Sequence, residues 1–433
     1  MRLAWFSPLS PVRSGIATYS ADILPRLRDA FAIDCFVDGA SSGEGVRSAW
    51  DFPWRHRRDP YDLTIYQLGN APCHDYMWAY LAAFPGLVVL HDARLHHARA
   101  RALLREERFD DYRAEFRFDH PGAVHDFTEY AVEGLGGPIY SFWSMLRVVM
   151  ETQRLIAVHN SRVATDLRDE YPGASVETIR MGVPALHTSA DRGARVRRSL
   201  AIPASAVVFT AFGKLTAEKR LGPIRRAFRE LVASGVDAYL LLVGDAFEAG
   251  TTDEDVQDAE RVRTTGHVPD VEVGNFLAAS DVCLCLRWPT ALETSAAWLR
   301  CLAAGKATVI TDLAHLADIP TLDPRTWQPS RAAQPPAAVG IDLLDEERSL
   351  LLAMRRLASD AGLRADLARN GAAYWERHHT LDLMAADYAR VIGAAAARPA
   401  PTPTGLPAHI TEDYSGTARA LARRFGVDVD ILS

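Results

Sequence analysis

An acid and the expected start of a helix lie next to each other in Arg287–Asp312, RWPTALETSAAWLRCLAAGKATVITD. The pattern predicts the end of a buried strand, a short polar loop ending in Glu293, a helix stopped by Gly305, and a second buried strand. The amides of Thr294 and Ser295 would then lack partners at a helix N-terminus, where the helix dipole favours an anion. Because Glu293 could accept hydrogen bonds from neutral hydroxyl groups beside that anion, we expect a phosphorylated sugar as the ligand. The alternative is that Glu293 only caps the helix.

Basic residues cluster on the loop after another apolar run, in VVFTAFGKLTAEKRLG. Gly213 and Lys214 end the run, and Lys219 and Arg220 come just before a helix-like segment. Cations separated by one short loop can converge on a diphosphate. The alternative of solvent-exposed lysines is weaker, because this loop would face the same edge of the structure as Glu293.

Two further segments place small or titratable residues after apolar runs. Gly15 follows the first run, where a glycine would let a ligand approach the backbone closely. His91, in LVVLHD, could hydrogen-bond a sugar hydroxyl or a developing charge, whereas a metal site that includes His96 and His97 has weaker support. The turn TGHVPD around His267 could present backbone groups to a base. The first loop has no G-x-G-x-x-G pattern, which argues against a dinucleotide dehydrogenase.

Unbroken apolar runs indicate the strands that would position these residues. Such runs are typical of strands buried on both faces, and hence of parallel sheets covered by helices. They form two sets, with helix-like segments such as Leu221–Ser234 between most of them: Leu3–Phe6, Ile33–Val37, Leu63–Tyr66, Leu87–Leu90 and Leu155–Val158, then Val207–Phe212, Tyr239–Val243, Val282–Leu286 and Thr308–Ile310. The sequence therefore predicts an α/β protein of two doubly wound, Rossmann-like domains with a cleft between the carboxyl ends of their strands.

The remaining segments complete this organisation. Residues 1–185 and 186–375 would form the two domains, and residues 376–398 either a surface helix or one that crosses back to the first domain, with an apolar face of Leu381, Met384, Ala385, Tyr388 and Ile392. Residues 399–433 would form a proline-rich linker and a tail with one short helix. Within the first domain, the mixed charges of Arg94–Phe118 favour a solvated helix, and YSFWSML (140–146) could form either an acceptor wall or core.

Composition excludes several classes of protein. The chain has 433 residues and a net charge of -7, from 48 Lys and Arg against 55 Asp and Glu, without the basic excess of a nucleic-acid-binding protein. Its five cysteines are scattered, so no disulfide framework is expected, and Cys283 and Cys285 would be small core residues of one strand. Since neither a signal peptide nor a membrane-length apolar stretch is visible, we expect a cytoplasmic protein; peripheral contact with the inner face of a membrane and the oligomeric state are left open.

Taken in order, these motifs resemble those of the retaining glycosyltransferases of family 4, which have the GT-B fold of two Rossmann-like domains and a C-terminal crossover helix. The resemblance covers the chain to about Ile392. It rests on SGIATYS, VVLHD, FGKLTAEKRLG, TGHVPD followed by FLAASDVCL, and PTALETSAAWLRCLAAGKATVITD.

The resemblance implies a role for each matching residue. Gly15 would lie near the donor phosphates and the acceptor, and His91 would contact the donor sugar. Glu293 would hold that sugar, and the turn at His267 would face the base. Lys214 and Lys219 would neutralise the leaving diphosphate, and the backbone amides of Thr294 and Ser295 would face it. We also expect Gly213 and Arg220 among the residues that bind the donor.

The sequence departs from the family pattern at two places. Lys214 stands where the family commonly has arginine. The second glutamate of the family's E-x7-E motif, which usually binds the nucleotide ribose, falls on Cys301 when counted from Glu293 and on Arg300 when LAAGK is aligned. The identity of the nucleotide is therefore left open.

The activity implied is transfer of a glycosyl unit from a nucleotide-sugar donor to a hydroxyl of a glycan or lipid-linked acceptor, with retention of configuration, in polysaccharide or glycolipid synthesis. We expect cations to stabilise the leaving diphosphate, with no cofactor and no metal, since two lysines already offset the phosphate charge and no D-x-D motif occurs in a suitable loop. The alternatives are a catalytically silent subunit that binds sugar nucleotides and a sugar-nucleotide epimerase of the same fold.

Overall fold

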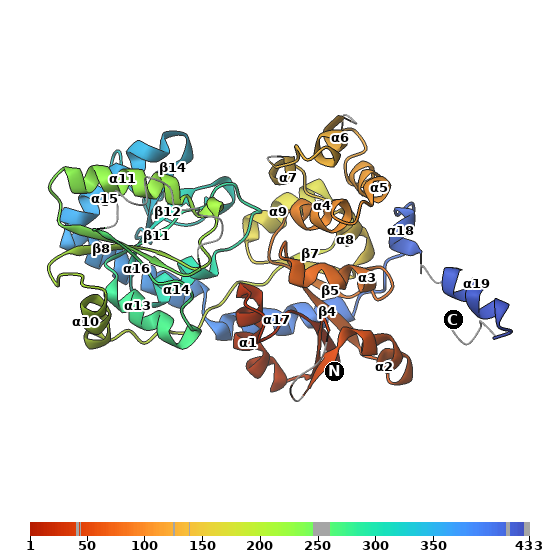
Figure 1. Cartoon of the computed structure of the whole chain (residues 1–433). Coiled ribbons are helices and arrows are strands. Elements are labelled where there is room, and N and C mark those ends of the chain that lie inside the picture. The colour runs from red at the N-terminus through yellow and green to blue at the C-terminus, as the bar shows by residue number, and fades with distance from the viewer. Residues whose placement is uncertain are drawn as a thin grey trace.

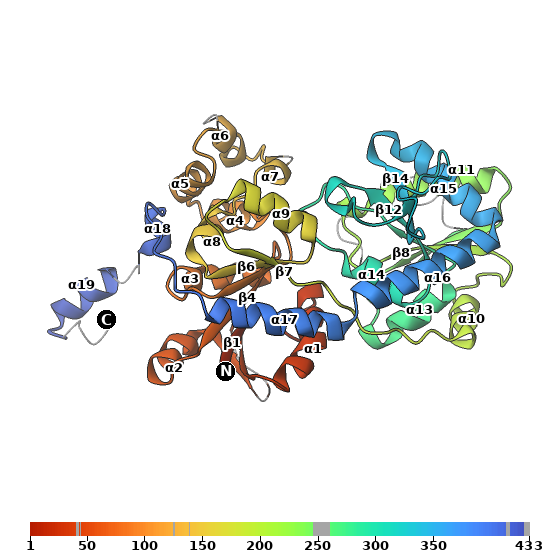
Figure 2. The ribbon, with the colours of Figure 1, turned by 180° about the vertical axis from the view of Figure 1, so that it is seen from behind.

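The computed structural model describes residues 1–39, 43, 45–123, 126–137, 139–245, 260–412 and 416–427. Two α/β domains lie side by side, each built on a sheet with helices on both faces (Figures 1 and 2). The predicted architecture is confirmed: this is the two-domain fold with facing Rossmann-like halves.

The first sheet has seven parallel strands in the order β3-β2-β1-β4-β5-β6-β7. Its strands are β1 (Arg2–Phe6), β2 (Ala32–Val37), β3 (Val46–Ser48), β4 (Leu63–Leu68), β5 (Leu87–Leu90), β6 (Leu155–Val158) and β7 (Val176–Thr178). All five predicted strands are present. The two that the sequence did not indicate, β3 and β7, are three-residue edge strands with polar members, too short to form an apolar run.

The second sheet repeats this plan with the order β10-β9-β8-β11-β12-β14-β13. Its strands are β8 (Val207–Phe212), β9 (Ala238–Val243), β10 (Val262–Thr264), β11 (Val282–Cys285), β12 (Ala307–Asp312), β13 (Thr321–Leu322) and β14 (Ala338–Asp342). In each sheet the strand order reverses beside the first strand, at β1/β4 and at β8/β11. Ligands of doubly wound sheets bind in the crevice beyond the carboxyl ends of the strands at such a reversal.

The helices lie on the faces of the sheets (Figures 1 and 2). The first domain contains α1 (Gly15–Arg28), α2 (Phe52–Arg58), α3 (Trp78–Leu81), α4 (His96–Leu104), α5 (Phe109–Asp119), α6 (Asp126–Val132), α7 (Ile139–Phe142), α8 (Arg147–Thr152) and α9 (Ser161–Glu170). The second contains α10 (Ala190–Ser199), α11 (Leu221–Ala233), α13 (Val273–Ala279), α14 (Ala296–Ala303), α15 (Glu346–Ser359) and α16 (Ala361–His378).

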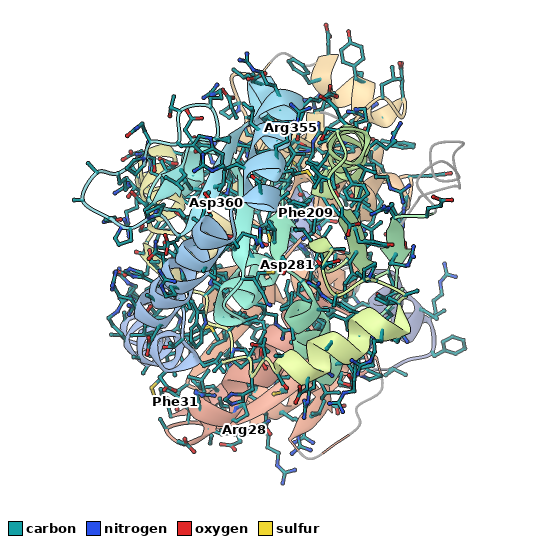
Figure 3. All side chains as sticks on the ribbon, turned by 90° about the vertical axis from the view of Figure 1, so that its left-hand side faces the viewer. Arg28, Phe31, Phe209, Asp281, Arg355 and Asp360 are labelled. Atoms are coloured by element: carbon teal, nitrogen blue, oxygen red, sulfur yellow. The ribbon has the colours of Figure 1, made fainter. Side chains whose placement is uncertain are left out.

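Asp281, just before β11, ties the second sheet to the helix at its margin. Its Oδ2 accepts hydrogen bonds from the Val208 amide and from Arg197 of α10, each at 2.7 Å. Figure 3 views this domain end-on and labels Asp281 beside Phe209, a fully buried residue of β8.

The segment Arg94–Phe118 differs from the expected solvated helix. It forms two helices, α4 and α5, whose facing sides bury a bidentate ion pair between Arg99 and Glu115, both about 5% exposed or less. Arg99 also lies over the ring of Trp78, 4.1 Å from its centroid. A burial of this kind depends on which side chains meet across the two helices, and charge composition alone does not reveal it.

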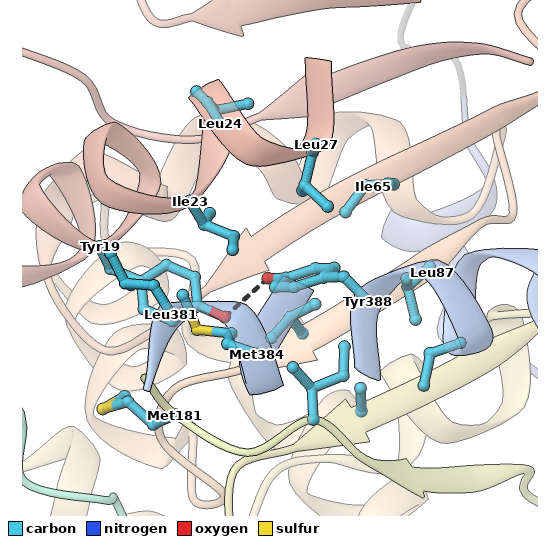
Figure 4. Packing of buried hydrophobic residues seen from close by; sticks show 14 of the residues in the cluster. Tyr19, Ile23, Leu24, Leu27, Ile65, Leu87, Met181, Leu381, Met384 and Tyr388 are labelled. Carbon is cyan, nitrogen blue, oxygen red and sulfur yellow. Dashed lines mark hydrogen bonds between the residues drawn. The ribbon is translucent and has the colours of Figure 1, made fainter. Parts of the chain in front are cut away.

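The chain crosses back to the first domain through α17 (Leu381–Ala396), after a break at His379 and Thr380. The helix packs on α1, β4 and β6. Its predicted apolar face is largely buried, and the hydroxyl of Tyr388 lies 2.8 Å from that of Tyr19 on α1 (Figure 4). The crossover is therefore confirmed, and it contributes to the core of the first domain.

The tail follows the first domain beyond α17. After the proline-rich linker, α18 (Ala408–Thr411) places His409 2.7 Å from Oε1 of Glu115. The helix α19 (Gly416–Arg424) lies beyond it, at the end of the molecule away from the second domain (Figures 1 and 2). Among the helices of the described ranges, none has the length and apolarity needed to cross a bilayer.

Replacing Tyr388 by alanine tests the contribution of the crossover helix. The side chain is fully buried and hydrogen-bonded to Tyr19, so Tyr388→Ala should destabilise the first domain by about 3–5 kcal/mol. Thermal unfolding followed by circular dichroism measures this. Asp382→Ala on the same helix is the control, because its carboxylate is 85% exposed and its pair with Arg26 should be worth less than about 1 kcal/mol. Equal shifts in both variants would contradict the prediction.

Candidate functional site

A cavity of about 630 Å³ lies between the domains at the carboxyl ends of both sheets. Loops that follow β1, β4 and β5 line it from the first domain, and loops that follow β8 and β11 line it from the second. These loops flank the two points where the strand order reverses. The predicted site residues that line it are Gly15, His91, Gly213, Lys214, Lys219, Glu293, Thr294 and Ser295.

Glu293 is held at the wall of this cavity by its own loop. Its carboxylate accepts hydrogen bonds from the amide of Ala291 at 2.8 Å and the hydroxyl of Thr290 at 2.9 Å, and it forms an ion pair with Arg287. The helix cap is instead Ser295, whose Oγ accepts from the amide of Trp298 at 3.2 Å. The alternative that Glu293 only caps the helix is therefore wrong.

The helix after Glu293 begins slightly later than its sequence suggests. Because Ser295 is the N-cap, α14 starts at Ala296, and the first-turn amides belong to Ala296 and Ala297, which also line the cavity. Thr294 and Ser295 lie just before that turn. At the other end, Gly305 has a φ of 62° and stops the helix as predicted.

The two lysines differ in their surroundings. Nζ of Lys219 lies 3.4 Å from the carbonyl oxygen of Phe212, and burial, assisted by the charge of Arg287, lowers its pKa. Lys214 is exposed at the rim of the cavity. Both lysines therefore bring positive charge to the cavity wall, Lys219 from a partly buried position and Lys214 from an exposed one.

Arg220, which the sequence places beside Lys219, is directed elsewhere. It forms a bidentate ion pair with Glu346, at 2.8 and 2.5 Å, and is not among the residues that line the cavity. His267 also lies outside the lining, 3.8 Å from Oδ2 of Asp245 and about half exposed. The structure thus brings eight of the ten predicted residues together and leaves these two apart.

His91 lines the cavity, but its ring nitrogens have partners inside the protein. Nε2 lies 2.9 Å from Oε1 of Gln67, and Nδ1 lies 3.3 Å from Nε2 of His159. Burial, followed by the neighbouring His159 and His74, lowers the pKa of His91, so its imidazole is neutral. Its contact with a donor sugar stays a prediction, and forming it requires the exchange of one of these hydrogen bonds.

Asp92 and Arg287 lie in the site but were not among the predicted site residues. Oδ2 of Asp92 accepts from the amide of Asn70 at 2.7 Å, and burial, with the charge of Glu293, raises the pKa of Asp92 to about 6. Arg287 joins Glu293 in the opposite wall. Arg287 directly follows a predicted strand and Asp92 comes two residues after another, so position near strand ends was the signal that could have identified them.

The domains meet around the cavity through a small set of contacts. The amide of Ala93, next to Asp92, donates to the carbonyl oxygen of Ala291 at 2.8 Å. The side-chain amide of Asn160 donates to the carbonyl oxygen of His315, also at 2.8 Å. The guanidinium of Arg300 lies 3.7 Å from Asp22 of α1. The first of these contacts holds the Glu293 loop against the first domain.

Arg300 and Cys301 occupy the positions that the resemblance assigns to a second glutamate. Arg300 lines the cavity and makes a bidentate ion pair with Asp270, in the turn after His267. Cys301 is fully buried, with its Sγ 3.9 Å from that of Cys285. This part of the wall therefore carries a cation that faces Asp22 of α1.

A second cavity of about 600 Å³ shares a wall with the first. The common residues are Arg287, Thr290, Glu293, Thr294 and Ser295. Its other side is formed by the end of β12, the break before α17 and the loop after β6. Glu293 therefore stands between two spaces, each large enough for a sugar.

The aromatic segment of residues 140–146 contributes to both uses considered from the sequence. Tyr140 and Ser141 line the first cavity, whereas Trp143, Met145 and Leu146 pack in the core. At the opposite loop, a Cβ on Gly15 would meet no atom within 4 Å. Across the part of the chain that the structure describes, there is no group of three His, Cys, Asp or Glu side chains arranged to bind a metal.

Comparisons with known proteins agree with the fold. Residues 206–325 match the family model of "Glycosyl transferases group 1". No curated protein matches the chain. HepE of Anabaena, solved with UDP and glucose, is similar in structure, with a TM-score of 0.61 at 15% identity, covering 91% of this chain and 100% of HepE.

Two other solved structures show the same likeness. Sucrose-phosphate synthase of Thermosynechococcus elongatus has a TM-score of 0.61 at 14% identity, covering 90% of this chain and 98% of its own. WaaG, a glycosyltransferase involved in lipopolysaccharide biosynthesis, has a TM-score of 0.60 at 12% identity, covering 89% of this chain and 99% of its own. The chain therefore has the GT-B fold, and its second domain matches the group 1 glycosyltransferases.

Asp92→Asn should stabilise the protein at neutral pH. A carboxyl whose folded pKa is about 6, above the ordinary 3.8, penalises folding above pH 6, and the penalty disappears as the pH falls toward 4. The variant removes it, so we expect a gain of about 1–3 kcal/mol at pH 7.5 and almost none at pH 4.

Urea unfolding at both pH values measures this difference. Asp166→Asn is the control, because Asp166 is half exposed and pairs with Arg162 on the same helix. A pH-independent effect of Asp92→Asn would show that its carboxyl is not penalised by burial.

Proposed function

We propose that the chain transfers a glycosyl unit from a nucleotide-sugar donor to a hydroxyl acceptor, with retention of anomeric configuration. The observation that carries this proposal is the convergence of Lys214, Lys219, Glu293 and the start of α14 on one cavity between two facing sheets. The match of residues 206–325 to group 1 glycosyltransferases supports it.

The donor fits the cavity by charge. Lys219, Lys214 and the first-turn amides of α14 supply positive charge for a diphosphate, while Glu293 can accept from sugar hydroxyls beside it. The HepE structure contains UDP and glucose, which makes UDP-glucose the first donor to test. The base would lie toward the turn around His267. A cytoplasmic location remains our prediction.

In the proposed transfer, the bond between the anomeric carbon and the diphosphate oxygen breaks, and a bond from that carbon to the acceptor oxygen forms on the same face of the sugar. The acceptor proton passes to the departing phosphate oxygen. Lys219 and Lys214 stabilise the charge that develops on the leaving group, which is the largest contribution expected of this site. The proposal needs neither a cofactor nor a metal.

One observation favours a second candidate, a silent subunit that binds sugar nucleotides. Arg300 points to Asp270 and Asp22 at the position where the resemblance expects a glutamate. Hydrolysis or transfer of the donor by the purified chain would exclude the silent subunit. A changed sugar in the absence of any acceptor would indicate the epimerase instead.

Glu293→Gln should reduce transfer from UDP-glucose by roughly 100-fold or more, about 2.7 kcal/mol, because the amide cannot balance Arg287 or bind sugar hydroxyls as a carboxylate does. Initial rates with a panel of sugar acceptors measure this. Glu347→Gln, an exposed partner of Arg226 in the second domain, is the control. Near-native turnover in Glu293→Gln would remove Glu293 from the site.

Lys214→Ala should lower kcat/KM by about 10-fold, or 1.4 kcal/mol, through weaker stabilisation of the leaving group. Lys214→Arg should restore most of the rate, because it keeps the charge. The anomeric configuration of the product, read from its proton coupling constants, tests retention separately.

A further inference from the structure

The short helical stretch before β4 exposes two tryptophans. Trp50, in the 3-10 turn Ala49–Asp51, is 75% exposed, and Trp54, in α2, is 68% exposed. They are the most exposed of the nine tryptophans. Indole rings are normally buried or at interfaces, so two exposed indole rings on one short segment indicate an interaction surface.

One side of this stretch is buried, and its exposed side carries aromatic and basic residues. Ala49 and Phe52 are buried and anchor it on the first domain. Trp50 and Trp54 are four residues apart and thus on the same side of the helical turns, and the exposed Arg58 follows four residues later. Residues 47–59 contain four arginines and two aspartates, although the chain as a whole carries a net charge of -7.

The tail helix α19 repeats this chemistry independently. Leu421 of this helix and Phe425, just after its end, are 55% and 77% exposed, and Arg423 and Arg424 lie between them in the sequence. Both α2 and α19 lie at the end of the molecule away from the second domain (Figures 1 and 2).

We propose that this end, comprising residues 49–58 and α19, docks on the surface of an anionic lipid bilayer. Tryptophan is favoured at the headgroup level, where its ring is in an apolar layer and its N–H meets water. Arginines beside it are attracted to anionic headgroups, whereas the remainder of this acidic chain is repelled, which orients the molecule. A convex helix with guanidinium groups on its exposed side suits a flat, negatively charged surface better than it suits an uncharged glycan.

Co-sedimentation of the full chain with vesicles tests the proposal. We expect binding to vesicles of phosphatidylcholine and phosphatidylglycerol at 3:1 to be at least ~10-fold tighter than binding to pure phosphatidylcholine, and to weaken as salt rises from 25 to 300 mM. Trp50→Ser/Trp54→Ser should lower the affinity by at least ~10-fold, and Arg58→Glu should remove most of the preference for the anionic lipid. Leu421→Ser/Phe425→Ser should weaken binding separately.

The matched control is Val271→Ser/Leu344→Ser. These residues are 86% and 96% exposed but lie in the second domain, so binding should be unchanged. Thermal unfolding checks that every variant is folded. Failure of the wild-type chain to bind either vesicle, or equal binding by the Trp50/Trp54 variant, would overturn the proposal. A fall in sedimentation coefficient for that variant, without vesicle binding by the wild type, would instead assign the surface to contact between two copies.

The measurement is independent of catalysis. A chain that binds anionic vesicles but transfers no sugar would leave this proposal standing and remove the proposed function. A chain that transfers sugar but does not bind anionic vesicles would support the proposed function and overturn the docking proposal.

Discussion

The direction of the strands is the constraint on which the rest of this structure depends. All pairings between the strands of each sheet are parallel, so every strand ends at the same edge, and the loops that leave those ends collect there. Two such edges face each other across the interdomain cavity. Residues as distant in sequence as Gly15 and Ser295 therefore line one space without any need for a local motif.

Charge in that space is organised around the Glu293 loop. Arg287 and two hydrogen bonds fix its carboxylate, and Asp92 approaches it from the other domain with its pKa raised to about 6. Lys219 carries a charge that burial disfavours. The carboxyl groups of Glu293 and Asp92 are thus held close together, beside a lysine whose charge burial disfavours. Preorganisation of this kind is what electrostatic catalysis requires.

The sequence was sufficient for the fold because nine strands of four to six residues contain mainly apolar runs. It failed for short or interrupted strands such as β14, in which Gly340 lies in the middle. For the site, strand-end position identified the right loops, but it could not separate Lys219 from its neighbour Arg220, whose partner Glu346 is 126 residues away. It also placed the start of α14 too early, because Thr294 and Ser295 are both residue types that can cap a helix, and the structure uses Ser295.

The lysine content of the chain is a further signal that points to the site. The chain has only three lysines among its 48 basic residues, and two of them are Lys214 and Lys219. The partners of the buried Arg99 and of Arg300 were beyond any such signal, since each depends on a contact between separate helices or turns.

The crossover helix has a consequence for biosynthesis. Met384, Tyr388, Val391 and Ile392 belong to the same buried cluster as Leu3, Trp5 and Ile23. During translation, the whole second domain is therefore synthesised before α17, which completes the core of the first domain. Until then, the apolar surface of the first domain that α17 covers is exposed. A fragment that ends at residue 185 would expose this surface permanently, because it lacks part of the core of the first domain.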